Sequence, residues 1–184
     1  MQTLNMFPTH IWATTELDID NKKFLKRIYK FVKTKESTPK SSVGGYQGHE
    51  MDDREFCEKV AELVPRKSDL GKFFVYNWVN INKKGHKNYR HFHYTSSLYI
   101  SGVYYAKVPE NSGRIRFYDP RGPFVRDAQD TVHFFGEYQY QYIVPQEGML
   151  LFFPTWLEHD VEENESDEDR VSVSFNIRLE DRPR

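Results

Sequence analysis

Two histidines, His91 and His93, lie one residue apart in the stretch "RHFHY", which immediately precedes a long run of strand-forming residues. In a β-strand, residues i and i+2 point to the same side, so both imidazole rings can face one metal ion. Neutral imidazole binds Fe(II), Zn, Cu or Ni. An H-x-H pair is a weak signal on its own, because histidines also occur as ordinary surface or packing residues. The pair therefore predicts a metal site only if the chain supplies further ligands.

A third histidine, His159, follows the apolar segment "GMLLFFP" and stands shortly before an arginine that begins the next expected strand. On that strand Arg170 and Ser172 are two residues apart, so they point to the same side. A guanidinium with a hydroxyl beside it can hold a carboxylate if this face looks into a barrel mouth. A histidine after an apolar strand, followed by an arginine that begins the next strand, is a more specific pattern than H-x-H.

The periodicity of apolar residues predicts two helices followed by a series of strands. An apolar face at helical spacing is present in residues 21–32 and again in 53–64. Strands are predicted at 72–81, 96–108, 113–120, 140–145, 148–154 and 170–179, separated by Gly, Pro and Asn turns. The segment 34–51 is rich in Ser, Gly and Pro and is predicted to be a loop. The order indicates a mainly β fold with flanking helices (α+β), an antiparallel barrel or sandwich.

The length and composition fit one domain. A chain of 184 residues can bury a core and enclose a small-molecule cavity. Phe and Tyr dominate the 16% aromatic share, and both residue types favour strands. We expect a single domain over residues 1–184, with a helical N-terminal part at about 1–70 and a β core at about 71–180.

Charge and cysteine content exclude several classes of protein. The net charge of −1 comes without clustered Lys or Arg, so no nucleic-acid partner is expected. A lone cysteine, Cys57, cannot form an internal disulfide and fits a reducing cytosol. No apolar run is long enough to span a membrane and no secretory signal pattern is present, so we expect a cytoplasmic protein. Helices outside a barrel can form a dimer face, which leaves a homodimer open.

Taken together, these segments resemble the Fe(II)/2-oxoglutarate-dependent oxygenases, close in pattern to the prolyl-hydroxylase-like branch. The resemblance covers about residues 72–180 and is carried by "SGVYYAK", "SGRIRFYDP", "VPQEGMLLFFP" and a late R-x-S-x-S-F-N. It is greatest to a compact group within this superfamily. The resemblance implies a double-stranded β-helix, which is a jelly roll related to the cupins.

The resemblance also implies roles for individual residues. His91, His93 and His159 fall on the metal motif, while Arg170 and Ser172 fall on the site for the far carboxylate of 2-oxoglutarate. The remaining predicted site residues are Tyr105 and Asn82 for 2-oxoglutarate, and Asn80, Asp119 and Arg121 for the substrate entrance. Strand alternation puts Tyr105 on the same side as Ser101. The implied cofactors are Fe(II), 2-oxoglutarate and O₂, with ascorbate as an optional reductant. The implied reaction is hydroxylation of an unidentified small molecule or protein side chain, with succinate and CO₂ as co-products.

One residue departs from the pattern of the family. His93 stands where the family usually has a carboxylate ligand. It could be the third ligand, it could lie behind the metal and leave a position for halide or water, or a carboxylate such as Asp119 or Asp160 could bind instead. We favour His93 as the ligand, because i and i+2 positions already bring both rings together. A neutral third ligand leaves the metal site one charge unit more positive.

Two other function classes remain open from the sequence. The first is a three-histidine cupin-type dioxygenase or isomerase that does not use 2-oxoglutarate. The second is a metal-free jelly roll that only binds a partner, since a fold does not imply its chemistry. Arg170 and Ser172 separate the oxygenase from the cupin-type enzyme, because the latter needs no dicarboxylate-binding pair. Absence of stoichiometric metal after anaerobic Fe(II) loading would favour the metal-free protein.

Overall fold

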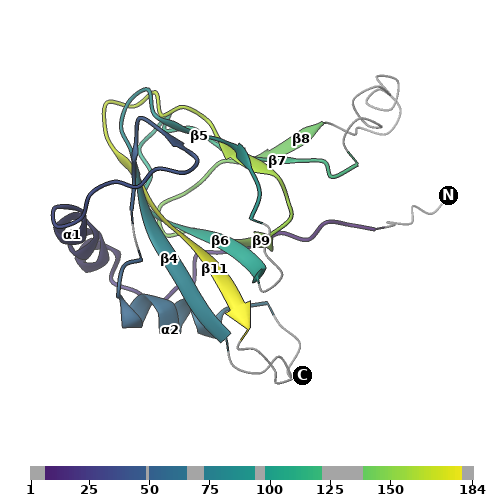
Figure 1. Cartoon of the computed structure of the whole chain (residues 1–184), viewed down its shortest axis with the longest axis horizontal. Helices are drawn as coiled ribbons and strands as arrows, with labels where there is room; N and C mark the ends of the chain where they lie inside the picture. The colour runs from purple at the N-terminus through teal and green to yellow at the C-terminus, as the bar shows by residue number, and fades with distance from the viewer. Residues whose placement is uncertain (1–6, 49, 66–72, 94–97, 122–138, 180–184) are drawn as a thin grey trace.

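The computed structural model describes residues 7–48, 50–65, 73–93, 98–121 and 139–179, which form two antiparallel sheets (Figure 1). The six-stranded sheet contains, in spatial order, β1 (Trp12–Thr14), β9 (Leu150–Pro154), β6 (Leu98–Lys107), β11 (Arg170–Leu179), β4 (Phe73–Asn82) and β3 (Tyr46–Gln47). The five-stranded sheet contains β2 (Ser42–Val43), β5 (Lys87–His91), β10 (His159–Val161), β7 (Ile115–Tyr118) and β8 (Tyr140–Ile143). This architecture confirms the expected mainly β fold of the double-stranded β-helix type.

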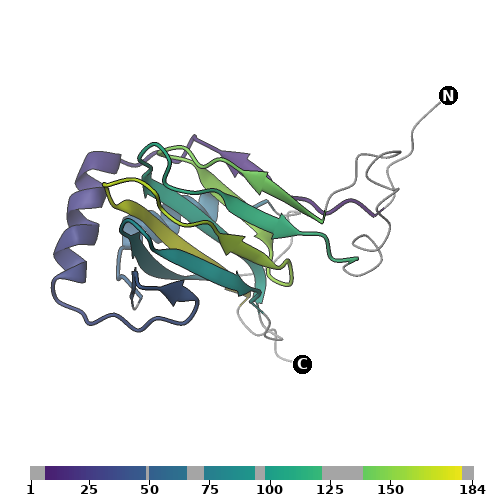
Figure 2. The same ribbon diagram turned by 90° about the horizontal axis from the view of Figure 1, so that it is seen from above.

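Two helices cover the outer face of the six-stranded sheet, as Figures 1 and 2 show. They are α1 (Asn21–Val32) and α2 (Arg54–Glu62), close to the predicted spans. Asp20 caps α1, and Asp53 caps α2 by accepting a hydrogen bond from the backbone N–H of Phe56 at 3.1 Å. The apolar stripes of the two helices meet where Phe24 stacks on Phe56, with ring centroids 5.0 Å apart. The helices therefore anchor to the sheet through a shared aromatic core.

The central strand β11 separates that core from the interior of the β-helix. Its odd-numbered residues from Val171 to Ile177 are buried against the helices, while its even-numbered residues face the other sheet. A second apolar cluster fills part of the space between the sheets and contains Val103, Tyr105, Ile115, Phe117, Leu151, Phe153 and Leu157. On the helix side of the sheet, Gly102 allows close packing, because a Cβ at this position would lie 2.2 Å from the Phe175 ring of the first core. Polar residues of β11 thus line the interior.

Residues 34–51 differ from the predicted loop. They contain β2, which pairs with β5 of one sheet, and β3, which pairs with β4 of the other. The Gln47 side chain holds this segment together, since its Oε1 accepts a hydrogen bond from the backbone N–H of Ser41 at 3.1 Å. The expected division near residue 70 is therefore not a boundary between helices and strands, because β1, β2 and β3 precede it. No helix in the described ranges is long and apolar enough to cross a membrane.

Candidate metal centre

The three predicted histidines converge at one edge of the interior. His91 and His159 lie directly opposite each other in the antiparallel pair of β5 and β10, with ring centroids 4.4 Å apart. His93 follows the end of β5, where its backbone N–H donates to the carbonyl of Thr155 at 2.8 Å. The His93 ring lies 5.2 Å from each of the other two. One ligand atom from each histidine lies within 4.8 Å of the others, a spacing that suits one metal ion.

Backbone carbonyls fix the protonation of two of these rings. Nδ1 of His91 lies 2.6 Å from the carbonyl oxygen of Tyr89, and Nδ1 of His159 lies 2.9 Å from that of Leu157. A carbonyl oxygen can only accept, so in both rings Nδ1 carries the hydrogen and donates it. The lone pair then resides on Nε2. Both imidazoles are thus oriented as metal ligands by the backbone two residues earlier in the chain.

The His93 ring is held by side chains of the opposite sheet. Its Nδ1 lies 2.9 Å from Oδ1 of Asn176 and 3.0 Å from Oγ of Ser101. Ser101 in turn donates to the same Asn176 oxygen at 2.7 Å. An amide oxygen that receives both hydrogens leaves Nε2 of His93 unprotonated. His93 is therefore arranged for ligation in the same way as the other two histidines.

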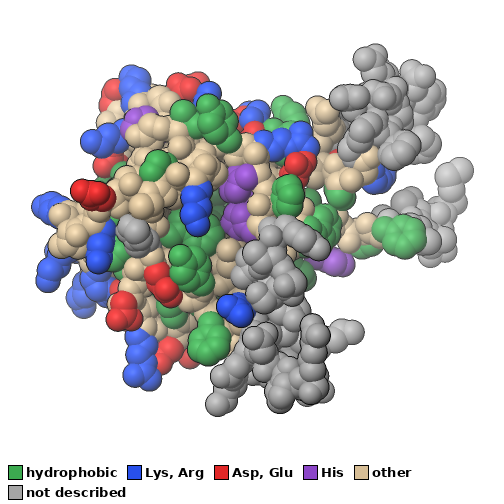
Figure 3. Space-filling view, in the orientation of Figure 1, with side chains coloured by type: hydrophobic (Ala, Val, Ile, Leu, Met, Phe, Trp, Pro, Cys, Tyr) green, Lys and Arg blue, Asp and Glu red, His purple; other side chains and the backbone are tan. Residues whose placement is uncertain are grey.

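Burial keeps the three rings neutral. It lowers the pKa of His159 to about 3 and that of His93 to about 4, and it lowers the pKa of His91 as well. The neighbouring imidazoles act in the same direction on His93 and His159. Near neutral pH the lone pairs are available for a metal. Figure 3 shows histidine side chains at the surface in the middle of one face. His91 and His93 are both partly exposed.

Polar side chains from three neighbouring strands lie side by side in a row on the inner face of the six-stranded sheet. Ser172 of β11 pairs in register with Tyr105 on one side and with Asn80 on the other. Arg170 precedes this row by one inward-facing position. All four residues line a narrow cavity of about 40 Å³ that also contains the three histidines. Tyr105 faces this interior, as strand alternation predicted.

Arg170 is a buried cation whose hydrogen-bond acceptors, in the part of the chain that the structure describes, are backbone carbonyls. Its side chain is 2% exposed, and its Nη1 donates to the carbonyls of Ser112 and Glu162. Within the described residues no carboxylate contacts it, and burial lowers its pKa to about 10. Gly113 (φ +88°) makes room for the guanidinium, because a Cβ there would lie 3.0 Å from Nη1. An unpaired buried charge is costly, so this site is suited to an anionic ligand.

The two asparagines of β4 differ from expectation. Asn82 is buried but does not line the cavity, and its amide nitrogen donates to Oδ1 of Asn88 at 3.3 Å. Asn80 does line the cavity, where it donates to Oγ of Ser174 at 2.9 Å. Its own Oδ1 is buried and has no hydrogen-bond partner among the described residues. Asn80 is therefore an interior residue and not an entrance residue. Asn82 lies outside the cavity and contacts Asn88, which does line it.

The candidate carboxylates do not join the histidines. Asp160 follows His159 on β10, so its side chain points to the opposite face, where Arg116 contacts both carboxylate oxygens at 2.7 and 2.6 Å. Asp119 forms an ion pair with Arg121, and neither residue lines the histidine cavity. Among the described residues, the three histidines are the one group with metal-ligand spacing. The alternative in which Asp119 or Asp160 is the third ligand is therefore wrong for this arrangement.

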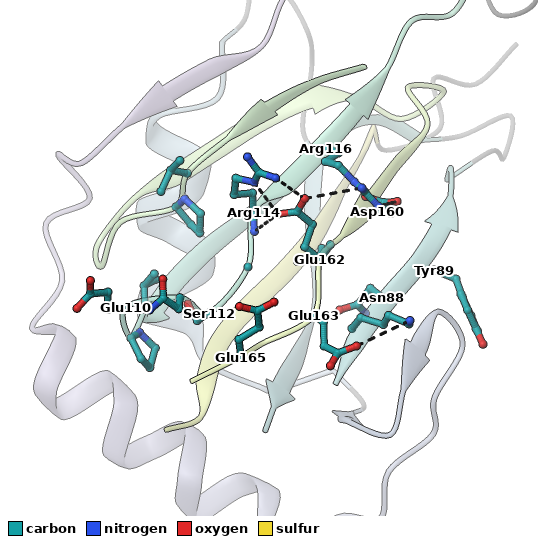
Figure 4. Close-up of a pocket in the computed structure, with 18 of the residues that line it drawn as sticks. Asn88, Tyr89, Glu110, Ser112, Arg114, Arg116, Asp160, Glu162, Glu163 and Glu165 are labelled. Carbon is teal, nitrogen blue, oxygen red and sulfur yellow. Dashed lines mark hydrogen bonds and ion pairs between the residues drawn. The ribbon is translucent and has the colours of Figure 1, made fainter. Parts of the chain in front are cut away.

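A larger cleft, about 1120 Å³, lies on the outer face of the five-stranded sheet (Figure 4). Two of its arginines are engaged by acids of the same cleft, as in the 2.6 Å contact between Nε of Arg114 and Oε2 of Glu162. Arg116 similarly pairs with Asp160. The histidines do not line this cleft. Size alone would favour the outer cleft as the binding site. The residues that can bind a metal ion and an anion, however, line the narrow cavity.

The position of Asp160 gives a testable prediction. We expect Asp160→Asn to leave Fe(II) affinity unchanged, because this carboxylate points away from the histidines. The free energy of unfolding should fall by about 1–3 kcal/mol, since Arg116 and Tyr118 lose a charged acceptor. Metal titration and urea denaturation measure the two effects. A loss of iron binding as large as that of His159→Ala would restore Asp160 as a ligand.

Comparison with known proteins agrees with this fold and site. A family model described as "Putative 2OG-Fe(II) oxygenase" matches residues 76–176. None of the curated proteins matches the sequence. Among solved structures, a prolyl-4-hydroxylase from Pseudomonas putida has a TM-score of 0.65 at 12% identity, with 94% of each chain covered. HygX from Streptomyces hygroscopicus, solved with nickel and 2-oxoglutarate, has a TM-score of 0.64 at 10% identity, covering 93% of this chain and 83% of HygX.

A third structure is a prolyl hydroxylase from Trichoplax adhaerens in complex with a peptide fragment of hypoxia-inducible factor. Its TM-score is 0.63 at 13% identity, covering 92% of this chain and 83% of that one. At such low identities the likeness concerns the fold alone. The family match is more specific, because it spans over half of the chain, from β4 to β11, and includes all three histidines and Arg170. The chain therefore belongs to the 2OG-Fe(II) oxygenase family and is an Fe(II)- and 2-oxoglutarate-dependent enzyme.

Proposed function

We propose that His91, His93 and His159 together hold Fe(II), and that Arg170 holds the far carboxylate of 2-oxoglutarate in the same cavity. The observation that carries this proposal is the buried Arg170 guanidinium, which lacks an acidic partner within the described residues and shares its cavity with three neutral imidazoles. A dicarboxylate that reaches from the metal to this arginine would supply the missing counter-charge. A metal-free binding protein has no need of either feature.

The chemistry of the donors fits both groups. Three neutral imidazoles suit Fe(II), and they leave other coordination positions free for a co-substrate. When bound, Fe(II) and 2-oxoglutarate supply the oxidation of a substrate by O₂, with succinate and CO₂ as co-products. The protein residues have the separate tasks of binding, orienting and shielding these reagents. We propose hydroxylation as the reaction class, acting on a substrate that the chain does not identify.

The row beside Arg170 supplies further contacts to the co-substrate. Burial raises the pKa of Tyr105, so its phenol stays protonated and can donate a hydrogen bond. Ser172 can donate from the adjacent strand, and Asn80 offers an amide from the strand beyond it. These three side chains are 2%, 7% and 5% exposed. A carboxylate held there is shielded from bulk water, which strengthens its attraction to Arg170.

A direct test uses anaerobic titration with Fe(II) followed by 2-oxoglutarate. We expect one iron per chain, a visible charge-transfer band on addition of 2-oxoglutarate, and succinate formation once O₂ is admitted. Iron binding without a band or succinate would favour the three-histidine cupin-type reaction. If no metal binds under anaerobic loading, the enzyme assignment of this cavity fails.

A further inference from the structure

We propose that Asn176 is a positioning residue for the third metal ligand, His93, and that Ser101 assists it. This inference rests on the proposed function of the cavity as a metal site. Asn176 is 9% exposed and Ser101 is completely buried, and the two lie in register on neighbouring strands β11 and β6. Their side chains form the only described hydrogen-bond partners of the His93 ring. A change at Asn176 should therefore act on the metal through His93 alone.

The three histidines are supported in different ways. His91 donates to the backbone carbonyl of Tyr89, and His159 donates to that of Leu157. A side-chain substitution does not remove a backbone carbonyl. His93 instead follows the end of β5, and its Nδ1 points towards side chains of the six-stranded sheet. This is the position where the family resemblance predicts a carboxylate in place of a histidine. The orientation of the His93 ring thus depends on side chains, and a substitution can change it.

The orientation of the Asn176 amide decides whether His93 can bind metal. With Oδ1 facing the ring, the amide accepts from Nδ1–H, and Nε2 presents its lone pair to the cavity. With the amide reversed, an N–H group would face Nδ1, and the hydrogen of the neutral ring would move to Nε2 and block ligation. In the first orientation the Ser101 hydroxyl donates to the same Oδ1 at 2.7 Å. Ser101 thus adds a second hydrogen bond to the amide oxygen that faces the His93 ring.

A neutral amide also sets the donor strength of the ligand. Hydrogen bonding of a ligating histidine to a carboxylate raises its basicity more than bonding to an uncharged acceptor does. Asn176 gives His93 an acceptor without adding a negative charge. Asn176→Asp would keep an acceptor towards Nδ1 and add that charge, whereas Asn176→Leu would keep the volume and remove the acceptor. The two variants separate the effect of hydrogen bonding from the effect of packing.

The first experiment measures the imidazole tautomer of His93 by ¹⁵N NMR in the metal-free protein. The wild type should carry its hydrogen on Nδ1, and Asn176→Leu should shift the ring substantially to the Nε2–H form. Asn176→Asp should retain the wild-type tautomer. Wild-type protein with His93 in the Nε2–H form, or an unchanged tautomer in Asn176→Leu, would overturn the proposal. This readout does not depend on iron or on 2-oxoglutarate.

The second experiment measures anaerobic Fe(II) affinity and the charge-transfer band formed with 2-oxoglutarate. Asn176→Leu should weaken Fe(II) binding by about 10- to 100-fold. Asn176→Asp should recover most of the affinity and move the band to longer wavelength, because a more basic ligand raises the energy of the iron electrons. Wild-type affinity in the leucine variant would contradict the role of Asn176. Iron binding without any band would contradict only the 2-oxoglutarate proposal.

A matched control is Asn77→Leu, which removes another buried amide from the same sheet. Asn77 faces the helices, where its side chain bonds the backbone of Met51 at 3.2 and 3.1 Å. This variant should lose stability but keep the Fe(II) affinity, the band and the His93 tautomer of the wild type. If Asn77→Leu changes them as much as Asn176→Leu does, the effect is general loosening of the sheet and the proposal is wrong. Should Asn176→Leu not fold, Ser101→Ala takes its place with the same expected direction.

Discussion

Replacing Arg170 by methionine should abolish 2-oxoglutarate binding without unfolding the metal-free protein. Loss of one partner from a buried charge pair costs about 2–5 kcal/mol, so the affinity for 2-oxoglutarate should fall on the order of 100-fold or more. The depressed pKa of Arg170 shows that the folded state disfavours its charge. Because the folded pKa lies below the unfolded one, this penalty applies at every pH at which arginine stays charged. Methionine removes the penalty.

The free protein should therefore be as stable as the wild type, or more stable, in urea denaturation. The variant does lose the hydrogen bonds from Arg170 to the carbonyls of Ser112 and Glu162. That loss is partly offset by burying an apolar side chain of similar length. Fe(II) affinity without 2-oxoglutarate should stay at the wild-type level, because the histidines do not contact Arg170. A variant that is strongly destabilised yet still binds 2-oxoglutarate would show that Arg170 is a structural residue.

Much of the site could be predicted because it lies on strongly patterned segments. The alternation in β11 put Arg170 and Ser172 on one face and the valines on the other, and both faces are observed. His91 and His93 line the same cavity as expected, but β5 ends at His91, so strand alternation alone does not place His93. The expected strand spans of β4 and β11 agree within about two residues with those observed. Where burial alternates regularly, sequence periodicity contains the information that positions the side chains.

The remaining features depend on partners that sequence order does not reveal. Alternation puts Asn80 and Asn82 on one face, but only the depth of the cavity separates the residue that lines it from the one behind. The short strands β2, β3 and β10 have two or three residues each and are defined by their neighbours. The role of Asn176 was not predicted, although its position on the polar face of β11 was the available signal. Its contact with His93 joins residues 83 positions apart.

Replacing His93 by aspartate should weaken iron binding, although it installs the residue type that the family usually has at this position. The aspartate side chain is shorter than histidine and does not span the same distance from β5 to the metal. Its oxygens would also face Oδ1 of Asn176, which is an acceptor and cannot bond to a carboxylate. We expect Fe(II) affinity to fall by about 10- to 100-fold or more, as for loss of a metal-site partner. Activity should fall with it.

Anaerobic Fe(II) titration of His93→Asp, His93→Ala and His10→Ala separates the possible roles of this residue. His10 is exposed and lies outside the cavity, so its variant should match the wild type and control for loss of a histidine. If His93 lay behind the metal and left a position for halide or water, His93→Ala would retain iron and gain sensitivity to added halide. If His93→Asp kept wild-type affinity, the cavity would accept either ligand. Loss of iron in both His93 variants is the result that a three-histidine centre requires, because the hydrogen-bond partners at this position are arranged for an imidazole.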